Sequence, residues 1–366
     1  MNSLSNQVEA LIRPEVLALS SYHVPDSSGY VKLDAMENPY DWPRDIVLDW
    51  LQALAQVRPN RYPDAQADAL KATIRYAHRI PDGASLMLGN GSDELIQIIL
   101  MAVAGTGVTI MAPEPTFVMY RQISRCLGLN FMGIPLRADF SLDLAAMRSA
   151  IEIHRPAVIF LAYPNNPTGN RFRADDVMDI VQRATGLVVV DEAYAPFANH
   201  TCMNEVDRHP AMLVMRTFSK LGLAGLRLGY LAGREEWITQ FEKVRLPYNI
   251  NVLTQATAEF VLRNPDFLDQ QVDAILAERD RLFAALAAMD DELEVYPSEA
   301  NFILFRLKHA EAQAIHGQLK AAGLLIKNLD KAGEALRGCL RVTVGKPDEN
   351  AKFLTALANA LYPAST

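Results

Sequence analysis

The sequence predicts an α/β fold in which a mainly parallel sheet lies between helices, followed by a smaller α+β domain. In the first 250 residues, short apolar runs recur, each followed by a turn rich in glycine, proline or asparagine and then by an amphipathic helix. The runs are continuous rather than alternating, which is typical of strands covered on both faces. In such sheets ligands bind beyond the carboxyl ends of the strands, so the polar turns should converge on one site.

The apolar runs of the larger domain mark its expected strands. These strands are 86–88, 108–111, 158–161, 187–190, 212–215 and 228–231. Glycine, proline and asparagine follow several of them, which indicates turns at their ends. The turns include 89–92, 113–116 and 164–169.

The pattern changes after about residue 250. Two helical stretches follow, and we expect a break between them at Asn264-Pro265, because proline interrupts a helix. The first stretch carries Leu253, Ala256 and Phe260 at helical spacing. Further apolar runs with helices between and after them indicate a small α+β domain. The expected strands of this domain are 301–305, 324–326 and 340–344.

A chain of 366 residues exceeds the usual size of one hydrophobic core, so two domains are expected. We predict an N-terminal arm over residues 1–40 and a large domain over 41–250. A small C-terminal domain over 251–366 should pack with the arm. The sequence shows no internal repeat, low-complexity tract or linker.

Composition argues against several classes of protein. A net charge of −8 disfavours a nucleic-acid-binding protein. Residues 1–15 lack a basic segment followed by an apolar core, and no apolar stretch reaches the roughly 18 residues of a membrane span. The three cysteines are scattered without CxxC spacing, as expected of reduced thiols. We therefore expect a cytoplasmic protein that binds neither membranes nor nucleic acid.

The sequence predicts no metal site. Its seven histidines show no metal-ligand spacing with one another or with the cysteines. The motifs HExxH, CxxC and GxSxG are absent, which removes the usual zinc and serine hydrolases. A dinucleotide site would use the turn 89–91, but this turn lacks GxGxxG and the interpretation leaves Lys220 without a purpose.

Lys220 follows the apolar run 212–215 and is the most informative residue of the chain. A lysine just beyond a buried strand, beside a hydroxyl and followed by glycines and an arginine, is poorly explained as solvated surface. Its amine is well placed to form a Schiff base, and Ser219 and Arg227 are suited to holding a phosphate. These are the two features that a protein supplies to bind pyridoxal phosphate covalently.

Two other strand ends carry polar residues. Asp191 ends an apolar run, where a buried carboxylate needs a partner such as a protonated pyridine nitrogen, although alone it could equally cap the next helix. Tyr194 can bring its hydroxyl to the same ring. Asn166 lies in a proline-rich turn and alone could be only a turn residue. Asn166, Asp191 and Lys220 are 25 and 29 residues apart, close to one strand–helix–strand unit each, which places them on one rim.

The turn 89–93 opens a predicted helix. Its two glycines let the backbone approach a ligand, and free N–H groups at a helix start attract an anion. Ser92 could bind a phosphate there or act only as a helix N-cap, and the sequence leaves both alternatives open.

Several motifs, in their order along the chain, resemble the fold-type I aminotransferases of classes I and II. They are Asn166-Pro167-Thr168-Gly169, Asp191-Glu192-Ala193-Tyr194, Ser219-Lys220 and Arg227. Within that superfamily the chain resembles the histidinol-phosphate aminotransferases over essentially its whole length. The motifs for this closer resemblance are 34–39, 60–63, 91–94 and 339–345. The resemblance implies a seven-stranded sheet, pyridoxal 5'-phosphate as cofactor and a homodimer with active sites at the interface.

The resemblance also implies roles for the site residues. Lys220 should bind the cofactor covalently and then move the proton between the substrate Cα and the cofactor C4′. Asp191 should pair with the pyridine nitrogen, while Tyr194 and Asn166 contact the phenolic oxygen. Phe117 matches the aromatic residue that stacks on the ring. The residues expected at the cofactor phosphate are Ser92, Asp93, Ser219, Arg227 and, from the neighbouring subunit, Tyr62.

Four residues are expected to bind the substrate. Arg341 matches an arginine that pairs with an amino-acid carboxylate or with the phosphate of histidinol phosphate. Tyr22 matches a residue that closes over that phosphate, and Asn166 is expected beside the substrate. Lys327 stands where many relatives carry a second arginine, so the charge is kept and bidentate geometry is lost.

Another departure concerns Arg227, which follows Lys220 by seven residues where many relatives have eight. We therefore expect a phosphate loop that is one residue shorter. Arg227 should still reach the phosphate.

We predict a pyridoxal-phosphate-dependent aminotransferase that works by ping-pong transfer. The expected substrates are histidinol phosphate and 2-oxoglutarate, interconverting with imidazole-acetol phosphate and glutamate in histidine biosynthesis. The alternatives are an aromatic or broad-range amino-acid aminotransferase and a threonine-phosphate-type decarboxylase on the same fold. A non-catalytic regulator is disfavoured, because a binding module has no need of a Schiff-base lysine.

Overall fold

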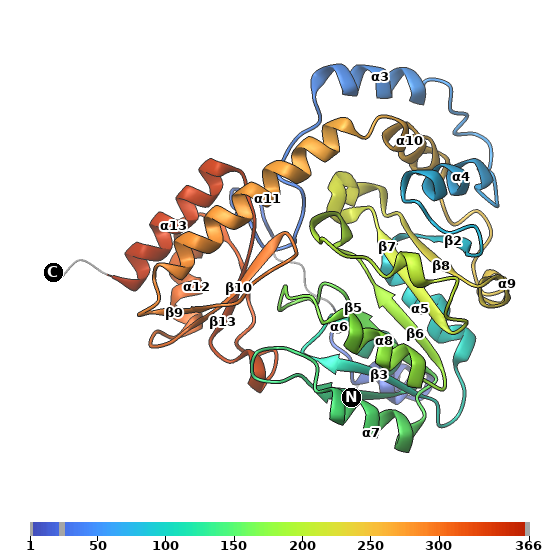
Figure 1. Ribbon diagram of the computed structural model, residues 1–366, viewed down its shortest axis with the longest axis horizontal. Coiled ribbons are helices and arrows are strands. Elements are labelled where there is room, and N and C mark those ends of the chain that lie inside the picture. The colour runs from blue at the N-terminus through green and yellow to red at the C-terminus, as the bar shows by residue number, and fades with distance from the viewer. Residues whose placement is uncertain (1–2, 22–25, 363–366) are drawn as a thin grey trace.

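Seven strands form the central sheet of the larger domain in this computed structural model, which describes residues 3–21 and 26–362 (Figure 1). The order across the sheet is β2-β8-β7-β6-β5-β3-β4. Strand β8 runs antiparallel to both of its neighbours, and the other strand pairs are parallel. The strands are β2 (Ser85–Gly89), β3 (Thr109–Glu114), β4 (Asn130–Pro135), β5 (Val158–Ala162), β6 (Leu187–Asp191), β7 (Met212–Thr217) and β8 (Gly229–Gly233). The predicted mainly parallel, seven-stranded sheet is confirmed.

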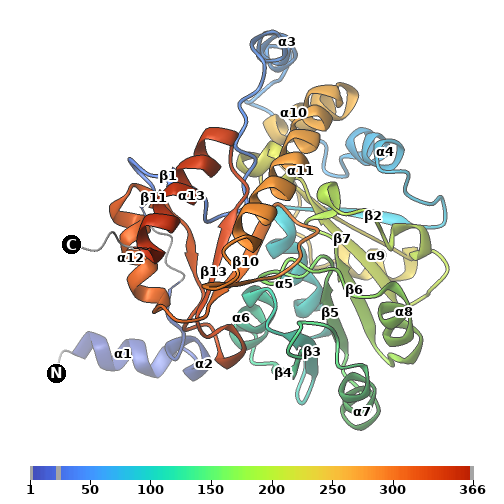
Figure 2. The same cartoon turned by 60° about the vertical axis from the view of Figure 1, so that its left-hand side comes forward.

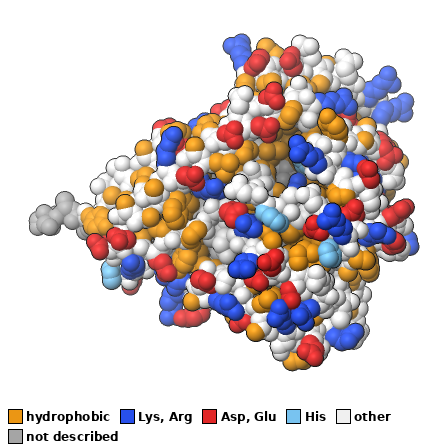
Figure 3. All heavy atoms as spheres, viewed as in Figure 1, with side chains coloured by type: hydrophobic (Ala, Val, Ile, Leu, Met, Phe, Trp, Pro, Cys, Tyr) orange, Lys and Arg blue, Asp and Glu red, His pale blue; other side chains and the backbone are white. Residues whose placement is uncertain are grey.

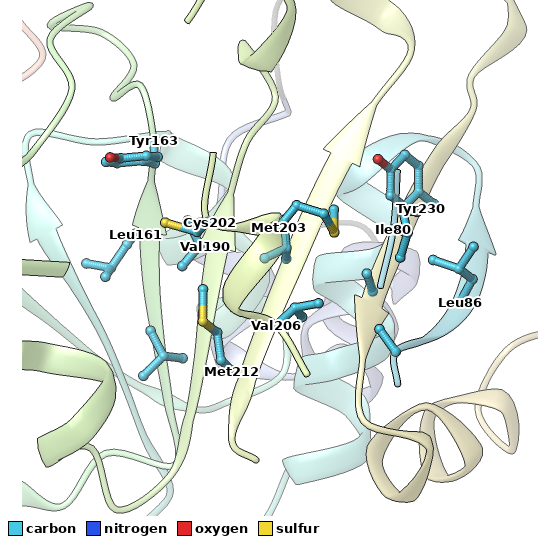
Figure 4. Close-up of a cluster of buried hydrophobic side chains, with 14 of the residues drawn as sticks. Ile80, Leu86, Leu161, Tyr163, Val190, Cys202, Met203, Val206, Met212 and Tyr230 are labelled. Carbon is cyan, nitrogen blue, oxygen red and sulfur yellow. The ribbon is translucent and has the colours of Figure 1, made fainter. Parts of the chain in front are cut away.

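Helices cover both faces of this sheet. One face packs on α4, α7 and α8, and the other on α5, α6 and α9. Along β5 and β6, neighbouring side chains alternate between the two cores, so both faces are apolar and the runs are continuous. Figure 4 shows part of the first core, including Leu161 of β5 and Val190 of β6. The helices are α4 (Asp68–Ala77), α5 (Gly91–Val103), α6 (Val118–Cys126), α7 (Leu144–His154), α8 (Ala174–Arg183) and α9 (Glu235–Glu242).

Strand β4 is the strand of this sheet that no apolar run predicts. It lies at the sheet edge, and of its six residues only Ile134 is fully buried. An edge strand is only partly covered, so its sequence does not show the continuous apolar run of a central strand.

The smaller domain contains a four-stranded antiparallel sheet in the order β12-β13-β10-β9. Helix α13 packs on α11 and α12 beside it (Figure 2). The predicted break at Asn264-Pro265 separates α10 from α11. The elements are α10 (Val252–Arg263), α11 (Asp266–Ala287), β9 (Leu293–Val295), β10 (Phe302–Leu307), α12 (Ala312–Ala321), β12 (Lys327–Asn328), β13 (Cys339–Thr343) and α13 (Pro347–Leu361).

The N-terminal segment contacts both domains. Arg13, between α1 (Ser3–Leu11) and α2 (Pro14–Leu17), donates a hydrogen bond to the carbonyl of Cys126 at the end of α6. Further on, β1 (Val31–Lys32) pairs in parallel with β11 (Leu324–Leu325) of the smaller domain. The segment therefore connects the two cores before α3 (Arg44–Leu54) begins.

Helix α10 belongs with the larger core. It packs on α3 and α4, and its buried face is formed by Thr254, Thr257, Ala258 and Val261. Leu253, which the sequence suggested for the apolar side, is 49% exposed. Threonines can face this core because their hydroxyls are bonded: Thr257 accepts from the indole of Trp50 at 2.9 Å, and Thr254 donates to a backbone carbonyl at 3.1 Å.

Helix α11 connects the two cores (Figures 1 and 2). Phe267 and Leu268 at its start lie in the larger core, whereas Val272, Ile275 and Leu282 lie in the smaller one. We propose that the domain boundary expected at residue 250 lies instead within the first turns of α11.

Acidic and basic side chains intermingle on the face shown in Figure 3. None of the helices in the described part of the chain is both long enough and apolar enough to cross a membrane. Within residues 3–21 and 26–362, no cluster of histidine, cysteine or acidic side chains could hold a metal ion.

Candidate active site

A cavity of about 100 Å³ lies at the carboxyl ends of β5, β6 and β7. Nine residues expected from the sequence line it, although they come from segments more than a hundred residues apart. They are Ser92, Asp93, Phe117, Asn166, Asp191, Tyr194, Ser219, Lys220 and Arg227.

Lys220 lies in the helical turn Ser219–Leu223 that follows β7. Its Nζ donates a hydrogen bond to the carbonyl of Ala35 at 3.2 Å and lies 6.0 Å from the centre of the Tyr194 ring. Burial, and after it the positive charge of Arg341, lower the pKa of Lys220 to about 8. At pH 7 roughly a tenth of this amine is therefore neutral and nucleophilic, far more than for an ordinary lysine.

Asp191 ends β6 and is only 3% exposed. Its Oδ1 accepts from the backbone N–H of Ala193 at 3.1 Å, and its Oδ2 accepts from the hydroxyl of Tyr120 at 2.6 Å. Burial raises the pKa of Asp191 against the opposing effect of the Tyr120 hydrogen bond, and the pKa lies at about 7. A cationic ring nitrogen would give this carboxylate the charged partner that burial demands.

Glu192, the next residue, points away from this cavity and into a separate one that Arg216 also lines. It is paired with Arg216 at 2.8 Å and accepts hydrogen bonds from Thr201 and from the backbone of Cys202. Two consecutive buried carboxylates thus differ. Glu192 is paired with a cation, whereas the donors that Asp191 has among the described residues, Tyr120 and the backbone of Ala193, are both neutral.

Arg341 brings the smaller domain to Asn166, which lines the cavity. It lies on β13, is 6% exposed, and donates one hydrogen bond to the side-chain oxygen of Asn166 and another to the carbonyl of Asp34 at 2.9 Å. Asn166 in turn donates to the hydroxyl of Tyr194 at 3.1 Å. Asn166 therefore connects Arg341 of the small domain to Tyr194 of the large domain.

The start of α5 faces Arg227 across a narrow gap. Gly91 has φ +76°, and a Cβ built on it would lie 2.7 Å from Nη2 of Arg227. Arg227 also donates to the hydroxyl of Ser219 at 3.3 Å and lies 3.5 Å from the carboxylate of Asp93. Its own backbone is left-handed, with φ 51°, and this conformation brings the guanidinium to Ser219 despite the short spacing from Lys220. Free N–H groups, a hydroxyl and a guanidinium thus converge where a phosphate would fit.

Tyr62 and Lys327, also expected at the site, do not line this cavity. Tyr62 is 81% exposed and its ring stacks on Tyr248 with centroids 4.5 Å apart. Lys327 on β12 is the register partner of Arg341, so the two side chains share one face of the sheet. Tyr22 is outside the described residues.

Sequence reasoning missed Tyr120, which contacts Asp191 from behind the cavity. It also missed Thr217, whose hydroxyl donates to Ser219 at 3.0 Å, and the carbonyls of Asp34 and Ala35. The spacing of Phe117 and Tyr120, one helical turn apart at the start of α6, is a signal that could have suggested Tyr120.

The family described as aminotransferase class I and II matches residues 28–357. This chain belongs to that family. The aminotransferase is 54% identical to histidinol-phosphate aminotransferase 2 of Nitrosococcus oceani over 96% of its own length and 98% of the relative's. It is 51% identical to histidinol-phosphate aminotransferase of Chromobacterium violaceum, again over 96% and 98% of the two chains.

The aminotransferase also resembles solved structures. Histidinol-phosphate aminotransferase from Sinorhizobium meliloti, in complex with pyridoxal-5'-phosphate, matches with a TM-score of 0.86 and 22% identity over 97% of this chain and 99% of that one. At this identity the likeness shows the fold, which confirms fold-type I. Family membership and the close relatives confirm the expected enzyme class, a transaminase that depends on pyridoxal 5'-phosphate.

The residues of the cavity fit this cofactor. Gly91 leaves room against Arg227 that any side chain would fill, and a second oxygen of Asp93 is buried there without a hydrogen-bond partner among the described residues. Asp191 offers a buried carboxylate to the ring nitrogen, and Lys220 offers a buried amine of lowered pKa to the aldehyde.

Proposed function

We propose that this aminotransferase interconverts histidinol phosphate and imidazole-acetol phosphate, with glutamate and 2-oxoglutarate as the second pair, in histidine biosynthesis. Curated relatives at 51–54% identity carry the name histidinol-phosphate aminotransferase. The observation that carries the proposal in this chain is the pairing of Arg341 with Lys327. These cations are opposite each other on adjacent strands of the small domain.

Two adjacent cations suit a doubly charged phosphate better than one carboxylate. Arg341 is held in place by Asn166 and by the carbonyl of Asp34. Lys327 is half-buried, and within the described residues no acidic side chain lies at ion-pair distance from it. Its charge is therefore available to a ligand. Tyr22 is proposed to close over the same phosphate.

When bound, pyridoxal phosphate supplies an aldehyde that takes up an amino group and a ring that delocalises the electrons left on the substrate's α-carbon. We propose that Lys220 binds the cofactor covalently and afterwards moves the proton between the substrate Cα and C4′. Its lowered pKa suits an amine that must take up and release a proton near neutral pH. Asp191 holds the proton on the ring nitrogen.

Other residues orient and hold the cofactor in this proposal. Tyr194 and Asn166 contact the phenolic oxygen, and Phe117 stacks on the ring. The backbone at Ser92 and Asp93, with Ser219 and Arg227, holds the phosphate. Their convergence on one cavity supports these roles.

We also propose a cytoplasmic homodimer in which Tyr62 reaches the cofactor phosphate of the neighbouring subunit. Tyr62 is too exposed to serve its own cavity, and the stack on Tyr248 holds its ring at the surface. Sedimentation of the cofactor-loaded enzyme tests the dimer, and a monomer would contradict it.

The substrate proposal is tested by comparing kcat/KM for histidinol phosphate, phenylalanine and aspartate. We expect histidinol phosphate to be preferred by at least tenfold, about 1.4 kcal/mol in transition-state binding. A preference for phenylalanine of that size would overturn the assignment in favour of an aromatic aminotransferase.

A further inference from the structure

Tyr120 lies behind the cavity and contacts two of its walls. It sits in the first turn of α6 and is fully buried. Its hydroxyl donates to Oδ2 of Asp191 at 2.6 Å, and its ring meets the ring of Phe117 edge-on with centroids 5.6 Å apart. The Tyr120 ring also stacks on Phe160 of β5, with centroids 4.6 Å apart and an interplanar angle of 9°. A single residue thus holds both the carboxylate and the aromatic ring that face the cofactor.

The direction of the Tyr120–Asp191 bond is fixed by the chemistry of its two ends. Burial and the negative charge of Asp191 raise the pKa of the Tyr120 phenol well above its usual value, so the phenol keeps its proton. Tyr120 is therefore the donor and Asp191 the acceptor. Among the effects on Asp191 that lower its pKa, this hydrogen bond is the largest.

The bond also fixes how the carboxylate is turned. Oδ1 is held by the backbone of Ala193 and Oδ2 by Tyr120, so the carboxylate plane has little freedom to rotate. Each oxygen still has a lone pair that can accept from a ring N–H.

We propose that Tyr120 is a positioning residue that keeps Asp191 ionised and correctly turned to accept the protonated pyridine nitrogen of the cofactor. Its action runs through Asp191, since Tyr120 itself does not line the cavity. The proposal depends on the cofactor and not on which substrate is used.

The plain alternative is that Tyr120 only fills the core between Phe117 and Phe160. Tyr120→Phe separates the two roles, because it keeps the ring and removes only the hydroxyl. Phe160→Leu is the matched control, because it disturbs the stack and leaves the hydroxyl bonded to Asp191.

The experiment measures the affinity of the cofactor-free protein for pyridoxal phosphate and for its 1-deaza analogue, in which carbon replaces the ring nitrogen. Both compounds carry the aldehyde and the phosphate, so contributions from Lys220 and Arg227 cancel in the ratio of the two affinities. A hydrogen bond to a charged group is worth about one to two powers of ten in affinity.

We expect Tyr120→Phe to lower the affinity for pyridoxal phosphate by about 10- to 100-fold. The affinity for the deaza analogue should fall by less than about threefold. Phe160→Leu should lower the affinity for both compounds by the same factor. Equal effects of Tyr120→Phe on the two compounds, or no effect on either, would overturn the proposal. An unaltered protein that binds neither compound would instead contradict the cofactor assignment itself.

Tyr120→His is a second variant that supplies a ring N–H donor at the same position. We expect it to restore most of the original preference for pyridoxal phosphate over the deaza analogue. If a folded Tyr120→His protein, checked by circular dichroism, shows no such preference, the proposal is also overturned. This measurement keeps the test decisive should Tyr120→Phe fail to fold.

Discussion

The two sides of the cavity are built differently. On the large-domain side, Asp191 and Lys220 follow adjacent parallel strands, and their positions are set by the backbone of one continuous sheet. On the small-domain side, Arg341 does not line the cavity, and its contacts with the cavity side include the side chain of Asn166 and the carbonyl of Asp34. The first side depends on the core of one domain, and the second depends on how two domains and the N-terminal segment meet.

The N-terminal segment forms the link between these sides. The carbonyl of Ala35 accepts from Lys220, and the side chain of Asn38 donates to the carbonyl of Leu221 at 3.3 Å. On the other side, the backbone of Met36 is bonded to Thr343 and Asn301 of the small domain, each at 3.0 Å. The difference teaches that the sheet positions Asp191 and Lys220, whereas the position of Arg341 depends on contacts between the two domains and the N-terminal segment.

The largest expected effect is on the large-domain side. Lys220→Ala should abolish the covalent absorption band of the bound cofactor and lower kcat by at least about 1000-fold, because it removes both the nucleophile and the proton carrier. Absorption spectra and steady-state kinetics measure the two effects. A variant that kept the band would show that another amine binds the cofactor. The large-domain side would then not supply the reacting lysine.

Gly91→Ala tests the phosphate end of the same side. The added Cβ would lie 2.7 Å from Arg227 at a residue with φ +76°, so it is strained and also displaces the guanidinium. We expect the affinity for pyridoxal phosphate to fall by roughly 10- to 100-fold. The matched control is Gly225→Ala, where nothing lies within 4 Å of the new Cβ and the affinity should not change.

Lys327→Gln tests the small-domain side. Removing this charge should lower kcat/KM for histidinol phosphate by about tenfold and leave the value for phenylalanine within about twofold. Lys331→Gln, an exposed lysine a few residues further on, serves as the control. Equal losses on both substrates would mean that Lys327 does not select for phosphate.

The smallest expected effect is that of the Arg341 charge, on the small-domain side, on the pKa of Lys220, on the large-domain side. The rate at which the cofactor-free protein binds pyridoxal phosphate covalently should rise with pH and level off above about 8, because only the neutral Lys220 amine reacts. Arg341→Gln removes a positive charge that lowers the pKa of Lys220, so the midpoint should move to higher pH. Stopped-flow absorbance at a series of pH values measures it, with the exposed Arg337→Gln as control. An unmoved midpoint would mean that the two sides are electrostatically independent.

The sequence predicted the large-domain side well because its residues stand at fixed places relative to strands. Lys220, Asp191 and Asn166 each follow an apolar run, and the rule that such ends converge in a parallel sheet is sufficient to bring them together. The edge strand β4 was not predicted, because only one of its residues is buried.

Other features could not be predicted from local patterns. In the sequence Tyr120 is indistinguishable from any other aromatic residue on a helix. Its proposed role depends on its contact with Asp191, which is 71 positions away. Asp34 and Ala35 contribute backbone carbonyls, which every residue type has, so no side-chain pattern predicts these contacts. The buried face of α10 was missed because threonine becomes acceptable in a core once its hydroxyl is bonded.

The neighbouring carboxylates at the end of β6 have a consequence for which sequence changes the fold can accept. Successive residues of a strand face opposite sides, so deleting one residue in β6 would put Glu192 in the place of Asp191. The cavity would receive a longer acid out of reach of Tyr120, and Arg216 would lose its partner at the same time. Substitutions can accumulate along β6 one by one as long as its apolar character persists, but a change in its length would cost cofactor binding and core stability together.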